Sequence, residues 1–305
     1  MNTQKIKPFV LPTAIVLGFA LHSYCAAASE TTPYVVFVIL LLTFCAVDLR
    51  RLRFSWLAFW LIVWQVAVSV AGYLALRLMK ADPTIAEGVL MAILCPVASS
   101  VAVISCMLGA NRETVTAFTI YGNIAAAIAA PVIFTAIGVH PELSFGASFI
   151  IVLRKIAPTL ALPYFVALTL QLWLPKANER LARYKGWAFY LWALLLLCTL
   201  GRSIDEIFQH GSGKGYLIAS LALVALAVCI LQFALGRKLG KAYGDTISGG
   251  QLMGQKNTGM GIWMAATFLH PLSSVALAFY SVFQNAFNSW QLWQANKKKE
   301  KQLER

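Results

Sequence analysis

Long apolar segments separated by short polar connections run through almost the whole chain. Ten of these segments, of 16 to 30 residues, are near or above the roughly 17 to 25 residues that an α-helix needs to cross roughly 30 Å of hydrocarbon. Helices are expected because an open strand would leave backbone groups unpaired in lipid. The pattern predicts membrane-spanning helices at residues 8–27, 33–48, 54–79, 84–108, 114–138, 145–174, 186–204, 215–236, 246–269 and 271–294.

The composition excludes a water-soluble globule, since 59% of the 305 residues are hydrophobic and 12% are charged, against about 25% charged in an ordinary soluble domain. All twelve carboxylates are expected at segment ends or in connections. Without carboxylates inside the spans, neither an intramembrane acid pair nor a zinc-peptidase motif can form, and there is no phosphate-cradling loop. We therefore expect an all-α polytopic membrane protein that is not an enzyme and binds neither a metal nor nucleic acid.

The positions of the positive charges predict the topology. With both termini inside, eighteen lysines and arginines lie in inside segments, and four (Arg77, Lys80, Arg202 and Lys214) lie outside. Such an excess is typical of cytoplasmic loops. Both termini are predicted to be cytoplasmic, in the inner membrane of a bacterium. The basic tail at 296–305 can lie on anionic lipid; the alternative is a stop-transfer anchor with no partner.

Polar residues recur in the two halves of the ten-helix set. Gln65 matches Gln232 in the eighth span, and Asn123 in the fifth span matches Asn285 in the tenth. Halves with five helices each must have opposite orientations, and inverted repeats with one broken helix per half are typical of secondary transporters. The alternative is a chance scatter of amides that hydrogen-bond between helices.

Two interruptions supply the candidate chemistry. Residues 249–259 hold four glycines, two glutamines and Lys256, although a lysine at a helix centre costs about 2.5–3.5 kcal/mol. Snorkelling to an interface is the alternative for Lys256. In the fourth span Pro96 removes a helical hydrogen bond and frees carbonyls to face a cavity; a simple kink is the alternative. Arg154 and Lys155 are expected to snorkel, and the positive intramembrane charge favours an anionic solute or a lipid headgroup.

These features resemble the bile acid:sodium symporter family. Its fourth and fifth helices are similar to the segment from Cys95-Pro96 through Asn111 to Pro131, and its ninth and tenth to Gly254–Met260 and Ser281–Asn285. The resemblance implies two inverted five-helix repeats whose broken helices 4 and 9 cross in a core domain. It divides the chain into a panel (1–52 and 143–212), a core (53–142 and 213–295) and the tail.

The resemblance also implies the site residues. The substrate would bind at the crossover, at Cys95, Pro96, Ser99, Ser100, Gln255, Lys256, Asn257, Thr258 and Asn285. Residual ion-site candidates are Gln65, Thr119, Asn123 and Gln251. Sodium-using members carry a glutamate in the ninth-helix stretch, whereas this chain has Lys256 and no carboxylate there. A hard cation such as sodium needs several oxygen ligands, by analogy with other hard cations.

The sequence therefore predicts a secondary transporter of a small organic anion, with no cofactor. We interpret Lys256 as the tethered charge that replaces sodium, with a proton at Lys256 as another coupling ion. An oxyanion or arsenite-type permease is the alternative, since Cys95 lies at the break. A membrane protein that binds a ligand without moving it is a further alternative. The sequence leaves the oligomeric state open.

Overall fold

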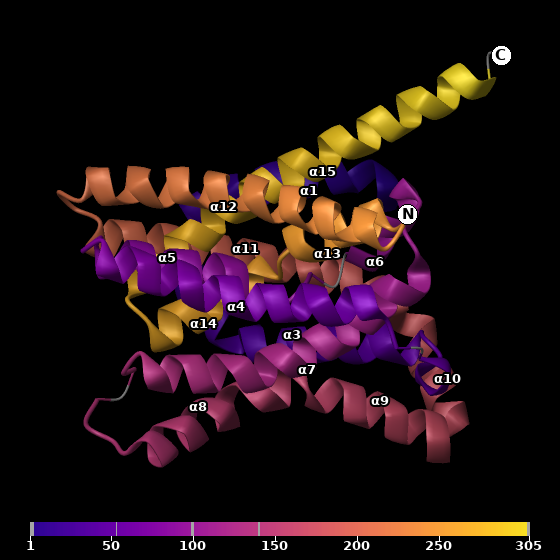
Figure 1. Ribbon diagram of the computed structural model, residues 1–305, viewed down its shortest axis with the longest axis horizontal. Helices are drawn as coiled ribbons and strands as arrows, with labels where there is room; N and C mark the ends of the chain where they lie inside the picture. Colours follow the sequence, from indigo (N-terminus) through magenta and orange to yellow (C-terminus); the bar gives the residue numbers. More distant parts are fainter. Residues whose placement is uncertain (1–2, 53, 99–100, 140, 304–305) are drawn as a thin grey trace.

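The computed structural model describes residues 3–52, 54–98, 101–139 and 141–303. This part of the chain is almost entirely helical and contains no β-strand, which confirms the predicted all-α class (Figure 1). Its helices are α1 (Thr3–Ala20), α2 (His22–Ala28), α3 (Thr32–Cys45), α4 (Trp56–Leu78), α5 (Pro83–Leu94), α6 (Val101–Leu108), α7 (Arg112–Ala136), α8 (Phe145–Leu160), α9 (Leu162–Trp173), α10 (Pro175–Arg183), α11 (Trp187–His210), α12 (Gly215–Ala242), α13 (Thr246–Gly254), α14 (Thr258–Phe268) and α15 (Ser274–Leu303).

Five helical segments of the described chain are long and apolar enough to cross a membrane. A sixth is added when α8 and α9, which meet at an angle of 45°, are taken as one bent span. These segments support a membrane-embedded protein. The five are His22–Cys45, Trp56–Leu78, Arg112–Ala136, Pro175–His210 and Gly215–Ala242.

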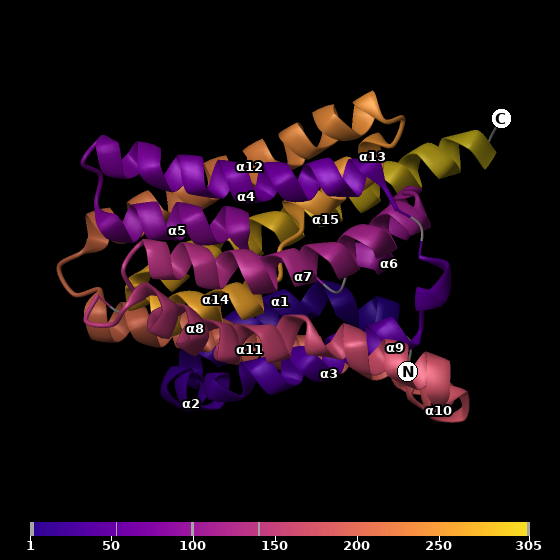
Figure 2. The same ribbon diagram turned by 60° about the horizontal axis from the view of Figure 1, so that its bottom comes forward.

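The helices form one elongated bundle. Figure 2 shows α4 and α12 along one side, α2 and α3 along the other, and α1, α5, α7, α14 and α15 between them. The two termini lie toward the same end of the bundle, which is also the end that carries α10 (Figure 1). The residues predicted as a separate tail continue α15 as a helix as far as Leu303.

Helix α11 extends beyond the predicted end of the seventh segment. The helix continues from the predicted end at 204 to His210 and so includes Asp205 and Glu206. Asp205 is 6% exposed and contacts His22 Nδ1 at 2.6 Å. Glu206 lies 3.0 Å from His210 Nδ1. Pairing with these side chains offsets the cost of carboxylates in the last turns of an apolar helix.

Close backbone contact between α12 and α13 positions the second interrupted helix. A Cβ atom at Gly249 would overlap Gly236 O and would lie 2.8 Å from Gly240 Cα. Only glycine leaves room for two backbones at this separation. The glycines that weaken α13 as an isolated helix therefore allow it to pack directly on α12.

His270 caps the turn that leads into α15, and this role predicts a pH dependence of stability. Its side-chain Nδ1 accepts the Leu272 backbone N–H at 3.2 Å, and the His270 backbone N–H donates to Glu87 Oε2 at 2.8 Å. Partial burial, followed by the nearby charge of Lys214, lowers the pKa of His270. A protonated Nδ1 cannot accept a hydrogen bond, so the cap requires the neutral ring. Asp82, His210 and Glu206 are the other titratable groups that act on this ring.

We expect the free energy of unfolding to decrease as the pH falls below about 6.5. The unfolded chain binds a proton near that pH, whereas folded His270 binds it only at lower pH, so acid favours the unfolded state. Thermal unfolding of the wild type and His270→Asn between pH 8 and pH 5 measures this effect, since asparagine can also cap a helix. Identical pH profiles for the two proteins would contradict the assignment.

Candidate functional site

The two interrupted helices meet at their breaks. The first break separates α5 from α6, and the second separates α13 from α14. The extended segments pair in antiparallel orientation, with Val97 opposite Lys256. Ala98 N–H donates to Gln255 O at 3.1 Å, and Asn257 N–H donates to Pro96 O at 2.8 Å. Residues about 160 positions apart in the chain thus form one small unit, in which each break satisfies backbone groups of the other.

Pro96 helps to explain why the first break needs outside partners. Proline has no N–H, and the extended chain after it leaves carbonyl oxygens at the end of α5 without helical donors. Side chains from three other elements replace those donors. Along α5 the bonds run from Gln232 Nε2 to Ala92 O (3.2 Å), from Lys256 Nζ to Ile93 O (2.8 Å), and from Gln65 Nε2 to Leu94 O (2.8 Å) and Cys95 O (3.1 Å).

Lys256 is fully enclosed, with 1% of its surface exposed. The snorkelling interpretation is therefore wrong for this lysine. Within the described chain no carboxylate pairs with it. Its ammonium group lies at the C-terminal end of α5, where the helix dipole places partial negative charge. The charge is thus held by a helix end and by the Ile93 carbonyl.

Helix α15 fixes the backbone of Lys256. Gln284 Oε1 accepts the Lys256 N–H at 2.8 Å, and Gln284 Nε2 donates to Lys256 O at 3.1 Å. The Tyr280 hydroxyl donates to Gly254 O at 2.9 Å. The sequence analysis missed both side chains as site residues. A glutamine beside Asn285 in an apolar span was the available signal for Gln284.

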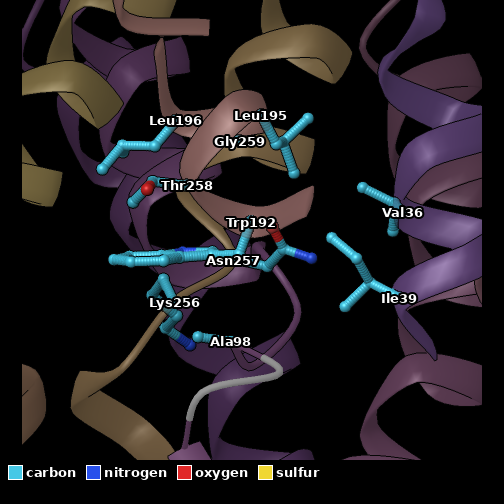
Figure 3. Close-up of a pocket in the computed structure, with 10 residues that line it drawn as sticks. All are labelled: Val36, Ile39, Ala98, Trp192, Leu195, Leu196, Lys256, Asn257, Thr258 and Gly259. Carbon is cyan, nitrogen blue, oxygen red and sulfur yellow. The ribbon is translucent and has the colours of Figure 1, made fainter. Parts of the chain in front are cut away.

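A narrow pocket, with a cavity volume of about 10 Å³, lies against the crossover, which is room for about one water molecule. One wall is formed by the crossover segments and the start of α14, and the opposite wall comes from α3 and α11. Figure 3 shows the Asn257 amide directed toward Ile39, and the Lys256 ammonium turned toward Ala98. The lining residues are Val36, Ile39, Ala98, Trp192, Leu195, Leu196, Lys256, Asn257, Thr258 and Gly259. The pocket therefore combines one polar wall with one apolar wall.

The N-terminal end of α14 contributes the hydrogen-bond donors of the polar wall. Asn257 caps this helix by accepting the Met260 N–H at 3.2 Å through Oδ1. The backbone N–H groups of Thr258 and Gly259 lie in the first turn, where no helical carbonyl can accept them. Thr258 is 4% exposed and its hydroxyl has no partner among the described side chains and backbone groups. A helix N-terminus with uncommitted donors attracts anions.

Among the described residues, the predicted crossover residues Cys95, Pro96, Gln255 and Asn285 do not line the pocket. The Cys95 thiol donates to Asn257 O at 2.9 Å and is fully buried. Asn285 Nδ2 donates to Ser281 O, one turn earlier on α15, at 2.7 Å. Gln255 donates to Gln251. Ser99 and Ser100, which the sequence analysis also placed at the crossover, lie outside the described residues.

Among the described contacts, Thr119 and Asn123 are the only predicted ion-site residues that bond to each other, and neither bonds to Gln65 or Gln251. Gln65 holds the end of α5, while the Thr119 hydroxyl donates to Val115 O at 2.8 Å and Asn123 Nδ2 donates to Thr119 O at 2.5 Å. Gln251 Nε2 donates to Gln291 Oε1 at 3.0 Å on the side of α13 that faces α15. Among the described residues there is also no cluster of three or more metal-binding side chains.

Arg154 and Lys155 lie outside the pocket. Both side chains are exposed on the surface of α8. Lys155 Nζ lies 5.6 Å from the ring centre of Phe268, within the range of a cation–π contact. Of the intramembrane cations expected from the sequence, Lys256 alone lines the pocket.

No protein-family model matches the chain, and a search of curated proteins finds no match. The geometry of the crossover and its pocket therefore carries the functional argument.

Proposed function

We propose that this protein is a secondary transporter of a small organic anion, similar in architecture to the bile acid:sodium symporter family. In this proposal ten spans form two inverted repeats in the inner membrane of a bacterium, with both termini cytoplasmic. Two local parallels support the repeat. Asp82 caps α5 and Asp245 caps α13, while Asn123 and Asn285 each donate to the carbonyl four residues earlier.

The observation that carries the proposal is the pocket against the crossover. Its polar wall offers the Thr258 hydroxyl, the Asn257 amide and two backbone N–H groups of the α14 N-terminus. These groups donate hydrogen bonds, and the positive end of the helix dipole favours negative charge. The facing wall, with Trp192 and aliphatic side chains, would contact the apolar body of a carboxylate once the two walls move apart.

In this mechanism Lys256 provides a tethered positive charge next to the pocket. The ammonium group holds the first break together through Ile93 O, and its charge also stabilises an anion at the polar wall. In a relative that lacks the lysine, a bound coupling cation would supply the positive charge that stabilises the anion. We therefore propose uptake that does not require sodium, with a proton as the remaining candidate for a coupling ion.

Alternating access would follow from movement of the apolar wall relative to the crossover. The walls belong to the segments assigned to the panel (1–52 and 143–212) and to the core (53–142 and 213–295). The interface is close at Gly259, where a Cβ atom would lie 3.0 Å from Leu195 Cγ. Aliphatic contacts of this kind carry no directional bonds, so they can slide at low cost.

The arsenite-type permease is the weaker candidate. Its argument rests on the Cys95 thiol, which donates its hydrogen bond to Asn257 O and does not line the pocket. An oxyanion would also leave the apolar wall without a function. A protein that binds the anion without moving it would keep the same pocket, so experiment must separate binding from transport.

Counterflow tests the proposal. Organic carboxylates are first screened by thermal shift, since a ligand that binds the folded state raises the melting temperature. The best ligand is then loaded into proteoliposomes, and accumulation of the labelled compound is measured with sodium and with choline outside. We expect transient accumulation that is equal in the two buffers. Binding without counterflow would overturn transport, and accumulation only with sodium would overturn the role given to Lys256.

A further inference from the structure

Helix α10 forms a basic surface beside the bundle that the transport proposal does not use. It begins at Pro175, directly after α9 ends, and occupies the end of the bundle that also carries both termini (Figure 1). Lys176, Arg180 and Arg183 are spaced at i, i+4 and i+7, so they share one helix face, which also carries Glu179 at i+3 and has a net positive charge. All three side chains are exposed.

The opposite face of α10 attaches the helix to the protein. Asn178 Nδ2 donates to Cys45 O at the end of α3 at 3.2 Å. Leu181 and Ala182 pack against the main hydrophobic cluster. The helix therefore has a fixed rotation, with its basic face directed away from the bundle. In the described chain no carboxylate pairs with the three cations of that face.

Large aromatic side chains flank this basic face at both ends of α10. Trp173 is 77% exposed, Tyr184 56% and Trp187 61%. Tryptophan and tyrosine are enriched at the level of lipid headgroups, where one part of the ring is dry and another is wet. A basic helix face between such residues fits the surface of an anionic leaflet.

We propose that α10 is an interfacial helix that binds the headgroups of anionic phospholipids. Lys176, Arg180 and Arg183 would contact lipid phosphates, while Trp173 and Trp187 would lie at the boundary with the acyl chains. The lipid would hold the connection between α9 and α11 at the membrane surface. This surface is separate from the crossover pocket and does not depend on the proposed transport function.

Native mass spectrometry of the full chain in mixed micelles tests the proposal. Phosphatidylglycerol and phosphatidylcholine are supplied in equal amounts, and the bound lipids are counted for the wild type, for Lys176→Gln/Arg180→Gln/Arg183→Gln, and for a control. The control, Arg112→Gln/Lys238→Gln/Lys241→Gln, removes three exposed cations from the start of α7 and the end of α12. We expect the α10 variant to lose most of its preference for phosphatidylglycerol, about fivefold for each charge removed, and the control to keep it.

An equal loss of the preference for phosphatidylglycerol in the two variants, or no loss in either, would overturn the proposal. Displacement of the lipid by inorganic phosphate, but not by chloride at the same ionic strength, would also overturn it, since it would show a site for free phosphate. If the triple variant does not fold, Arg180→Gln alone is expected to reduce the preference about fivefold. Unfolding temperatures in neutral detergent confirm that each variant is folded.

Discussion

Replacing Lys256 with methionine is expected to reduce anion uptake at least tenfold. Methionine keeps an unbranched apolar chain of similar length but removes the buried ammonium group and its bond to Ile93 O. A hydrogen bond from a charged group contributes about 1.5–3 kcal/mol, and about 1.4 kcal/mol corresponds to a factor of ten in an equilibrium constant. The loss should affect both the geometry of the break and the attraction for the anion.

The matched control is Lys155→Met. This lysine also lies in an apolar segment, but it is exposed on α8 and does not line the pocket. We expect its uptake to stay near that of the wild type. Uptake by Lys256→Met at the wild-type rate would remove Lys256 from the mechanism. The melting temperature of each variant without ligand separates a loss of function from a loss of folding.

The largest expected effect on stability is at Gly249. Alanine at this position would place a methyl group 2.8 Å from Gly240 Cα and against Gly236 O, both backbone atoms of α12. The backbone of α12 cannot move aside as a flexible side chain can, so α13 would have to separate from α12. Overpacking typically costs about 1–3 kcal/mol, and we expect Gly249→Ala to lie at or above the upper limit.

Gly146→Ala provides the control for this substitution. Gly146 lies in the first turn of α8, and a Cβ atom there would meet nothing within 4 Å. Alanine is the better helix former by about 1 kcal/mol, so this variant should be as stable as the wild type or slightly more stable. Thermal unfolding in detergent measures both. A Gly249→Ala protein as stable as Gly146→Ala would show that α12 and α13 are not held at this contact.

Local sequence features were sufficient for the positions of most helices. Interruptions were expected at 95–100 and 249–259 because proline and glycine act on the backbone of their own turn. The second break lies at 255–257, while Gly249, Gly250 and Gly254 lie within α13. The C-terminal end of the seventh segment could not be predicted in this way. Asp205 and Glu206 indicate a polar connection when only the sequence is known, yet α11 includes them because His22 and His210 lie within reach.

The candidate site was predictable in part. Residues 255–258 were expected at the crossover, and the structure places them there, paired with 96–98. The roles of the side chains could not be derived in the same way, because a hydrogen-bond partner depends on distances between segments that are far apart in sequence. Gln65 therefore holds the end of α5 and gives no sign of a shared ion site with Thr119 and Asn123.

By itself, the sequence determined that the chain is helical and membrane-embedded and that two segments cannot be continuous helices. These properties follow from the length of apolar runs, the preferences of single residues and the placement of charges, all of which act locally. Only the tertiary structure decided that Lys256 points into the end of α5, that Gln284 fixes its backbone, and that α14 presents its N-terminus to an apolar wall. Each of these depends on packing between distant helices, because a buried charge or donor is stable only where the fold brings a partner to it.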